Sequence, residues 1–138
     1  NKVFVIYKFK TIPTKVGDVP SADLNTEKIK PFSRVARRTN IDELPQLFNV
    51  LEGNMSIVGP RPAILSQERL IVLRKRSHVN NLAKPGITGL AQVNAYDMMS
   101  DEKKVAYDEA YCENINFTSD IIILMKTVSY IFRKQPTY

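Results

Sequence analysis

The chain opens on a run of β-branched and aromatic residues between positions 3 and 12. In an extended chain, side chains alternate between two faces, so Lys8 shares a face with Phe4 and Ile6. β-branched and aromatic residues at this density favour strands over helices. The pattern therefore predicts a strand over residues 3–12, with lysines at its end.

A helical period follows at four apolar positions spaced i, i+3, i+4 and i+7, namely Leu44, Leu47, Phe48 and Leu51. Pro45 has no backbone N–H and is tolerated only in a first turn, so we expect the helix to begin at about residues 40–42. Gly53 is a typical signal for the end of a helix. The spacing predicts that the four apolar side chains form a buried stripe.

The rest of the chain combines short extended runs with helices. A short apolar run over residues 55–58 ends in the rigid turn Gly59-Pro60-Arg61-Pro62, and residues 84–94 pass from a Pro-Gly turn into a second extended segment. Residues 13–27 have two prolines and no apolar period, which predicts a surface loop. Three further helices are predicted, over residues 64–76, 101–114 and 117–134. Together these elements predict an α+β fold, a mostly helical single domain with a few short strands.

The predicted C-terminal helix has an apolar face that consists of Ile121, Leu124, Met125, Val128 and Phe132. Basic residues flank this face, namely Lys126, Arg133 and Lys134. The pattern is compatible with a helix packed on the core and with a helix lying on a membrane surface.

Composition limits the classes of function. A chain of 138 residues with 43% hydrophobic and 25% charged residues can bury a core, which excludes wholesale disorder. One cysteine, Cys112, and one histidine, His78, exclude a disulfide scaffold and a Cys/His zinc cage. No run approaches the roughly 18 apolar residues that are needed to cross a bilayer. The net charge of +6 favours anionic partners: nucleic acid, phosphorylated metabolites or acidic lipid headgroups.

The basic residues concentrate between Lys28 and Arg38, a segment with five Lys or Arg and no acidic residue. Such a run is commonly a solvated face. Binding of single-stranded nucleic acid would call for aromatic residues among the cations, and this segment has only Phe32. We therefore expect no nucleic-acid partner.

Asp42 and Glu43 are the first candidates for chemistry, because two adjacent carboxylates open a helix directly after the basic run. One interpretation is structural: acidic residues complement the helix dipole, and Asn40 with Glu43 resembles a capping box. The other is a phosphate site to which Arg37, Arg38 and Arg61 are brought. In that site one carboxylate is a nucleophile towards phosphorus, and its neighbour holds Mg²⁺. Spacing alone leaves both interpretations open.

The turn Gly59-Pro60-Arg61-Pro62 is the second candidate, since two prolines fix the direction of one guanidinium, which can grip a phosphate with two hydrogen bonds. The segment Pro85–Gly89 lacks the pattern of a phosphate-binding loop and is interpreted as structural. His78 and Cys112 have no partner at catalytic spacing, which disfavours a Cys-His nucleophile.

Three blocks of the chain resemble the bacterial sugar transferase family: FVIYKFKTI (4–12), RRTNIDELPQLFNVLEGNMSIVGPRP (37–62) and KPGITGLAQVN (84–94). These are the monotopic polyprenyl-phosphate phosphoglycosyltransferases that initiate O-antigen, capsule and exopolysaccharide synthesis. The resemblance implies transfer of a phosphosugar from a UDP-sugar to undecaprenyl phosphate, with release of UMP. It also implies a covalent aspartyl-phosphosugar intermediate and Mg²⁺ as cofactor.

The resemblance also implies residue roles. Asp42 matches the family's nucleophile, and Glu43 matches its magnesium-binding partner. The residues that match the family and are expected to bind phosphate or substrate are Lys8, Arg37, Arg61 and Asp108, the last of which forms a D-x-x-Y pattern with Tyr111. Arg38, from the basic run, is expected to join them.

The sequence departs from the family pattern in several places. Lys10 replaces a usual arginine and Leu90 a frequent tryptophan, which are mild changes. Ala95-Tyr96 stands where many relatives have Gly-Arg, which removes a cation. This change keeps an alternative open, in which the chain is a catalytically degraded scaffold or an anion-binding module of a polysaccharide assembly complex.

By this resemblance, residues 1–138 are the cytosolic catalytic domain of a sugar transferase whose N-terminal re-entrant membrane helix is not in the chain. The expected location is the bacterial inner membrane, with the catalytic domain on the cytoplasmic side and facing that leaflet. A homo-oligomer is an open alternative to a monomer.

Overall fold

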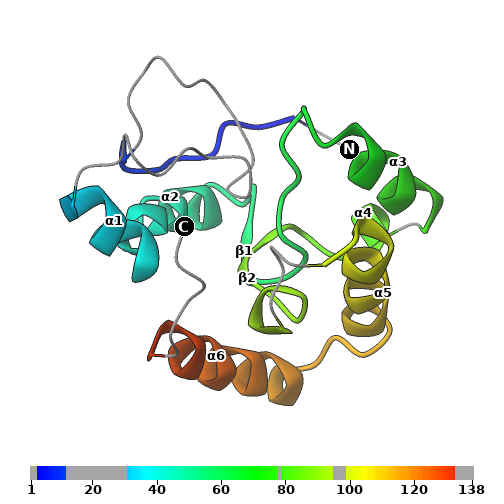
Figure 1. Cartoon of the computed structure of the whole chain (residues 1–138). Helices are drawn as coiled ribbons and strands as arrows, with labels where there is room; N and C mark the ends of the chain where they lie inside the picture. The colour runs from blue at the N-terminus through cyan, green and yellow to red at the C-terminus, as the bar shows by residue number, and fades with distance from the viewer. Residues whose placement is uncertain (1–2, 12–30, 78, 95–98, 133–138) are drawn as a thin grey trace.

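The computed structural model describes residues 3–11, 31–77, 79–94 and 99–132. Two short strands, β1 (Ser56–Val58) and β2 (Gly86–Thr88), lie at its centre between two groups of helices (Figure 1). The helices are α1 (Pro31–Arg38), α2 (Gln46–Leu51), α3 (Glu68–Arg76), α4 (Val79–Leu82), α5 (Asp101–Cys112) and α6 (Phe117–Phe132), and the 3-10 turns are η4 (Ile41–Glu43) and η5 (Gln92–Asn94). The mostly helical α+β class predicted from the sequence is confirmed.

The two strands pair in parallel, with Ser56 opposite Gly86 and Val58 opposite Thr88. A parallel pair needs a crossover connection, and here the connection carries α3 and α4. The backbones approach so closely beyond β1 that a Cβ on Gly86 would lie 2.1 Å from the Gly59 nitrogen. Two glycines are therefore required where β1 passes into the Gly-Pro-Arg-Pro turn.

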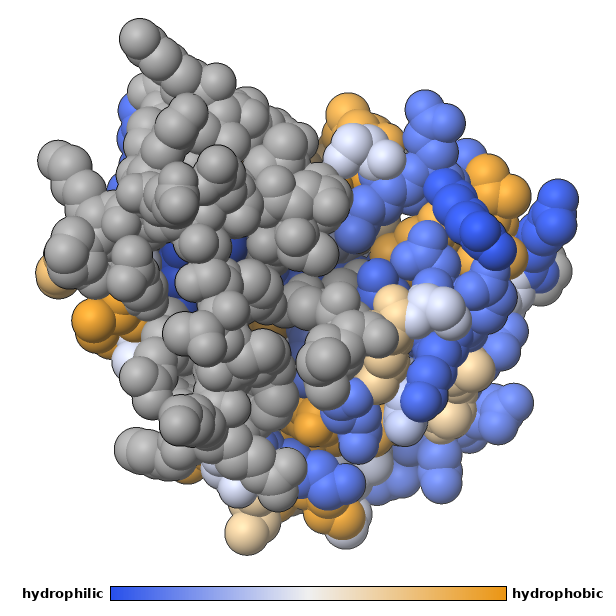
Figure 2. Space-filling model, viewed as in Figure 1, coloured by the Kyte–Doolittle hydropathy of each residue, from blue (hydrophilic) through white to orange (hydrophobic). Residues whose placement is uncertain are grey.

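The main core cluster joins the strands to the C-terminal helices and consists of Val58, Val93, Tyr111 and Ile123. On the other side of the strands, where α3, α4 and α5 contact one another, Leu70 and Val79 are completely buried. That side of the surface is largely hydrophilic (Figure 2). None of the helices in the described ranges is long and apolar enough to cross a membrane.

Several predicted elements are confirmed. The extended segments at residues 55–58 and 84–94 contain β1 and β2, and the helices predicted over 101–114 and 117–134 are α5 and α6. Ser100 begins α5 as its N-cap, because its side chain accepts a hydrogen bond from the Lys103 N–H. The helix predicted from residue 64 begins only at Glu68. The loop predicted over 13–27 lies outside the described residues.

The strand predicted over residues 3–12 is wrong for the described part, residues 3–11, which has no secondary structure assigned. Its backbone does not pair with a neighbouring strand and instead forms hydrogen bonds with individual groups of other residues. Asn49 on α2 contributes two of these groups: its Oδ1 accepts a bond from the Tyr7 N–H (3.1 Å), and its Nδ2 donates to the Val5 carbonyl (2.7 Å). A side-chain amide thus takes the place of a partner strand.

The buried stripe predicted over residues 44–51 is also wrong. The exposed fractions are 54% for Leu44, 47% for Leu47, 63% for Phe48 and 83% for Leu51. The face that is buried carries Gln46 and Asn49 instead, because Asn49 anchors residues 5–7. The helix is also split, since η4 spans residues 41–43 and α2 begins at Gln46, directly after Pro45.

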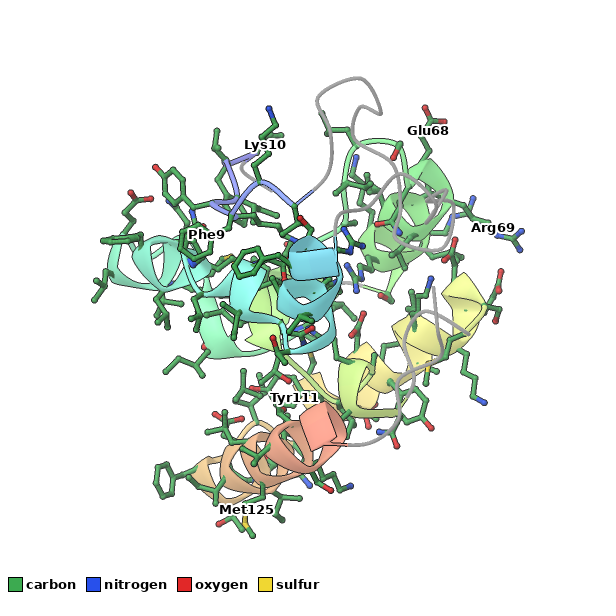
Figure 3. The ribbon with its side chains drawn as sticks, turned by 60° about the vertical axis from the view of Figure 1, so that its left-hand side comes forward. Phe9, Lys10, Glu68, Arg69, Tyr111 and Met125 are labelled. Carbon is green, nitrogen blue, oxygen red and sulfur yellow. The ribbon has the colours of Figure 1, made fainter. Side chains whose placement is uncertain are left out.

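The face predicted on α6 is only partly on the core. Among residues 117–129 of α6, whose side chains the structure describes, Ile123 is the buried one, at 2% exposure, with Leu124 packed beside it. The side chain of Phe132, which was also predicted on this face, lies outside the described part. Ile121, Met125 and Val128 are exposed, and Figure 3 shows Met125 on the outer side of the helix. Most of the apolar face therefore points away from the core.

Candidate functional site

The acidic pair lies on η4, where the chain turns sharply after α1. Asn40 makes this turn with a φ of 54°, a left-handed conformation that asparagine adopts more readily than most residues. Its side chain forms no capping hydrogen bond, so the predicted capping box is wrong. A three-residue 3-10 turn also has little dipole to complement. Asp42 and Glu43 are nevertheless buried, each 8% exposed, which a structural role at a helix start does not explain.

Glu43 is the centre of a cluster of charges. Its Oε1 accepts hydrogen bonds from Lys8 Nζ at 2.8 Å and Arg61 Nη2 at 2.7 Å, and its Oε2 accepts from Arg61 Nη1 at 3.3 Å. Burial raises the pKa of the carboxyl, but Arg61 and Lys8 outweigh burial and lower it to about 2. Glu43 is therefore an anion at neutral pH.

Asp42 has different electrostatics from its neighbour. Burial and the adjacent Glu43 raise its pKa, while Lys8 and Arg37 act in the opposite direction. A higher pKa makes the ionised carboxylate more basic, which favours a nucleophilic role. The site thus combines one carboxylate that is stabilised as an anion with one whose pKa is raised.

The N-terminal segment, residues 3–11, reaches this site through backbone contacts. The Phe9 N–H donates to the Asp42 carbonyl at 2.9 Å, next to Lys8, whose amine reaches Glu43. Asn49 positions the same segment two residues earlier. Sequence reasoning missed Asn49, although a signal was present: Gln46 and Asn49, spaced i and i+3, are polar residues inside a predicted apolar helix.

The structure brings together five of the predicted residues, from four parts of the chain: Lys8, Arg37, Asp42, Glu43 and Arg61. The side chain of Arg38 lies outside the described part of the structure, as do His78 and Ala95-Tyr96. Asp108 pairs with Arg74 of α3 and is 2% exposed. Its role in substrate binding stays a prediction.

Tyr111, the other residue of the D-x-x-Y pattern, is buried between α5 and α6 (Figure 3). Its hydroxyl donates to Asp120 at 2.9 Å. Burial, together with this carboxylate, raises the pKa of the phenol. It is therefore neutral and part of the core.

Among the described residues, no group of three or more His, Cys, Asp or Glu side chains could hold a metal ion. Asp42 and Glu43 are the two carboxylates at the site. Mg²⁺ is commonly bound by one or two carboxylates and completes its shell with water and substrate phosphates. The donor set therefore fits Mg²⁺ when a phosphate-bearing substrate supplies further oxygens.

A hollow with largely apolar walls lies away from this cluster, between α2, β1 and α6. Its volume is about 440 Å³, and its walls include Val50, Ile57, Phe117 and Ile121, with Lys84 at the side. None of the five clustered residues lines it. The charge cluster, which suits phosphate chemistry, and the apolar hollow thus lie at different places in the structure.

Three curated relatives match most of the chain. An undecaprenyl-phosphate galactose phosphotransferase from Salmonella typhimurium is 42% identical over 156 residues, which cover 99% of this chain and 32% of the relative. An uncharacterized sugar transferase from Bacillus subtilis is 38% identical over 127 residues (92% and 62%), and a UDP-glucose:undecaprenyl-phosphate glucose-1-phosphate transferase from Escherichia coli is 36% identical over 145 residues (99% and 31%). The chain thus spans between about a third and three fifths of these relatives.

The family described as bacterial sugar transferase matches residues 1–134, nearly the whole chain. This match includes all five residues of the charge cluster. The chain therefore belongs to the bacterial sugar transferase family.

Proposed function

We propose that this chain is the catalytic part of a phosphoglycosyltransferase, which transfers a phosphosugar from a UDP-sugar to undecaprenyl phosphate and releases UMP. The observation that carries the proposal is the buried pair Asp42 and Glu43, with Lys8, Arg37 and Arg61 around it. Two relatives are named for transfer of galactose or glucose phosphate to undecaprenyl phosphate, which supports the same substrate class.

In the first step, a carboxylate oxygen of Asp42 attacks the phosphorus that carries the sugar. The bond from this phosphorus to the UMP oxygen breaks, and UMP leaves with the electron pair. In the second step, a phosphate oxygen of undecaprenyl phosphate attacks the same phosphorus. The bond to Asp42 then breaks, which restores the carboxylate.

The cations have two roles in this proposal. Arg61 and Lys8 hold Glu43 and would balance the negative charge of a bound diphosphate. Arg37 adds positive charge near Asp42, as its effect on the pKa of that carboxyl indicates. Phosphoryl transfer depends mainly on such positioning and charge stabilisation.

Mg²⁺ is the proposed cofactor, and Glu43 is the residue that would hold it. When bound, the ion would neutralise charge on the phosphates and stabilise the leaving group.

The acceptor is a lipid, so the proposed location is the cytoplasmic face of the bacterial inner membrane. The exposed apolar residues of α2 support contact with a membrane, since Leu47, Phe48 and Leu51 lie on one side of a short helix.

The experiment that tests the function is detection of the covalent intermediate. The protein, expressed in full from its gene, is incubated with a panel of UDP-sugars and magnesium but no lipid acceptor. We expect one phosphosugar mass on a peptide that contains Asp42, together with UMP release. Both should be lost in Asp42→Asn, whose amide keeps the shape but is a far poorer nucleophile, and after addition of EDTA.

The matched control for Asp42→Asn is Asp101→Asn, which changes a carboxylate on α5 that pairs with Lys104. This variant should form the adduct at the parent's rate. An adduct that persists in Asp42→Asn would exclude the covalent role of Asp42. Absence of both adduct and UMP release in the parent, across the panel, would favour the scaffold alternative.

A further inference from the structure

Arg74 and Asp108 form a buried ion pair behind the Gly-Pro-Arg-Pro turn. Their side chains are 3% and 2% exposed. Arg74 donates to Asp108 Oδ2 from Nε at 2.9 Å and from Nη2 at 2.6 Å. Its remaining nitrogen, Nη1, donates to the backbone carbonyl of Arg61 at 2.5 Å. The guanidinium thus links α5 to the turn.

A buried ion pair is weak evidence for stability, because desolvation of two charges offsets much of their attraction. The third hydrogen bond of Arg74 is what distinguishes this pair. It fixes a backbone atom of the very residue whose side chain binds Glu43. The pair is therefore placed to control where the Arg61 guanidinium lies.

The same side of α5 makes a second contact with this segment. Tyr111, three residues after Asp108, has its hydroxyl 3.4 Å from the carbonyl oxygen of Val58, at the end of β1. Tyr111 therefore contacts the backbone just before the turn directly. Asp108 is linked to the backbone of the turn itself through Arg74.

The strand β2 holds the turn from its other side. The Gly86 N–H donates to the Pro60 carbonyl at 2.9 Å, and the Gly59 N–H donates to the Thr88 carbonyl at 2.8 Å. Successive residues of the turn are thus bonded to β2, and the next carbonyl is bonded to Arg74. The Arg61 side chain is left to extend towards Glu43.

We propose that Arg74 and Asp108 are positioning residues, which hold the Arg61 carbonyl so that its guanidinium is directed at Glu43 and at the phosphates of the donor. The proposal rests on the proposed function for its effect on turnover, but its geometric part does not. Asp108 acts through Arg74, and Arg74 acts through Arg61.

Arg74→Lys is the central variant. Lysine keeps a positive charge beside Asp108. Its single ammonium, on a shorter side chain, cannot replace both the two hydrogen bonds to Asp108 and the hydrogen bond to the Arg61 carbonyl. We expect kcat for UMP release to fall by about 10- to 100-fold, with the KM for the donor changed less than about threefold, as for a misplaced catalytic group.

Two further variants separate positioning from folding. Arg74→Met combined with Asp108→Leu replaces the ion pair by apolar groups, which commonly preserves stability, and it should lose as much kcat as Arg74→Lys. Arg69→Lys is the matched control, because Arg69 lies on the same helix but pairs with Glu102 at the surface. It should have the parent's kcat and KM.

A double-mutant cycle with Arg61→Ala then tests the direction of the effect. If Arg74 acts through Arg61, Arg74→Lys should lower kcat by less than about threefold when it is introduced into the Arg61→Ala variant. A merely structural role would give the full additive loss in both backgrounds. Additive losses, or a folded Arg74→Lys variant with normal kcat, would overturn the proposal.

A readout without turnover keeps this test independent of the proposed function. The rate at which phenylglyoxal modifies Arg61, followed by mass spectrometry, should rise severalfold in Arg74→Lys and stay unchanged in Arg69→Lys. If the parent formed no adduct and no UMP but Arg61 reactivity still rose, the proposed function would fail while the positioning role survived. Unchanged Arg61 reactivity in a folded Arg74→Lys variant would exclude positioning.

Discussion

Glu43 has the most strongly paired carboxylate at the site, with partners that lie 35 and 18 residues away in sequence. Its pKa falls from the usual 4.5 to about 2 on folding, because Arg61 and Lys8 outweigh burial. The unfolded chain therefore binds the proton more tightly than the folded one. The stabilisation is complete above about pH 4.5 and is lost as the pH falls towards 2.

We predict that Glu43→Gln destabilises the protein by about 2 kcal/mol at pH 7 and by much less near pH 2.5. Urea denaturation at several pH values, with EDTA present so that no metal competes, measures this difference. Glu68→Gln, which changes an exposed carboxylate on α3, should show no such pH dependence. A gap between parent and Glu43→Gln that is the same at pH 7 and pH 2.5 would contradict the charge cluster.

Cys112 gives a second prediction at the scale of single residues. Burial, with a contribution from Asp108, raises the pKa of its thiol to about 11. Only about one thiol in a thousand is then ionised at pH 8, and the thiolate is the reactive form. We expect iodoacetamide to label Cys112 far more slowly in the folded protein than in urea. Equal labelling rates at pH 8 would show that this side of α5 is open.

At the scale of elements, the contact between β1 and β2 depends on two glycines. A Cβ on Gly86 would lie 2.1 Å from the Gly59 nitrogen and 2.5 Å from the Thr88 oxygen, both backbone atoms that cannot rotate away. We predict that Gly86→Ala costs about 3 kcal/mol and also reduces turnover, because it displaces the turn that carries Arg61. Thermal or urea unfolding measures the cost.

Gly53→Ala is the matched control for this substitution. Gly53 ends α2 with a φ of 76°, and the nearest atom to an added Cβ is 3.9 Å away. We expect Gly53→Ala to lower the free energy of unfolding by about 1 kcal/mol, which is the cost of the left-handed backbone alone. A Gly86→Ala variant no less stable than Gly53→Ala would contradict the close approach of the two strands.

The elements also show how far sequence patterns determine this structure. Local signals placed α5 and α6 and both strands, because caps, turns and apolar runs act within a few residues. The pattern failed at residues 3–11 and on α2, where one side chain decides the outcome. Asn49 forms hydrogen bonds with the backbone of residues 5–7, and the polar face of α2 is therefore turned inwards. The polar pair Gln46 and Asn49 marks a second face of the helix, but periodicity does not identify the distant segment that this face contacts.

The candidate site was predictable to a similar degree. The residue types around Asp42 and Glu43 indicated a phosphate site, and resemblance to a family narrowed the choice between two interpretations. The burial of Glu43 and its pairing with Arg61 required the folded chain. Arg74 was indistinguishable from the other cations at the end of α3, because its role depends on a partner in α5.

At the scale of the whole molecule, the surface of the described residues is uneven in polarity. The α3 and α5 side is hydrophilic, whereas α2 exposes Leu47, Phe48 and Leu51, of which Leu51 is 83% exposed. An exposed apolar cluster of this kind, on a chain with a net charge of +6, suits the surface of an anionic membrane. The proposed reaction also requires contact with a membrane surface, because its acceptor is a lipid.

We therefore predict that the chain binds vesicles containing phosphatidylglycerol at low salt and is released as the salt concentration rises, because part of the attraction is electrostatic. Phe48→Ser combined with Leu51→Ser should weaken this binding about tenfold or more, since both side chains are exposed and their loss removes apolar contact without opening the core. Val72→Ser on α3, also at an exposed apolar residue, is the control and should bind like the parent. Vesicle co-sedimentation measures all three. Equal binding by the α2 and α3 variants would assign attachment to charge alone and remove α2 from the membrane contact.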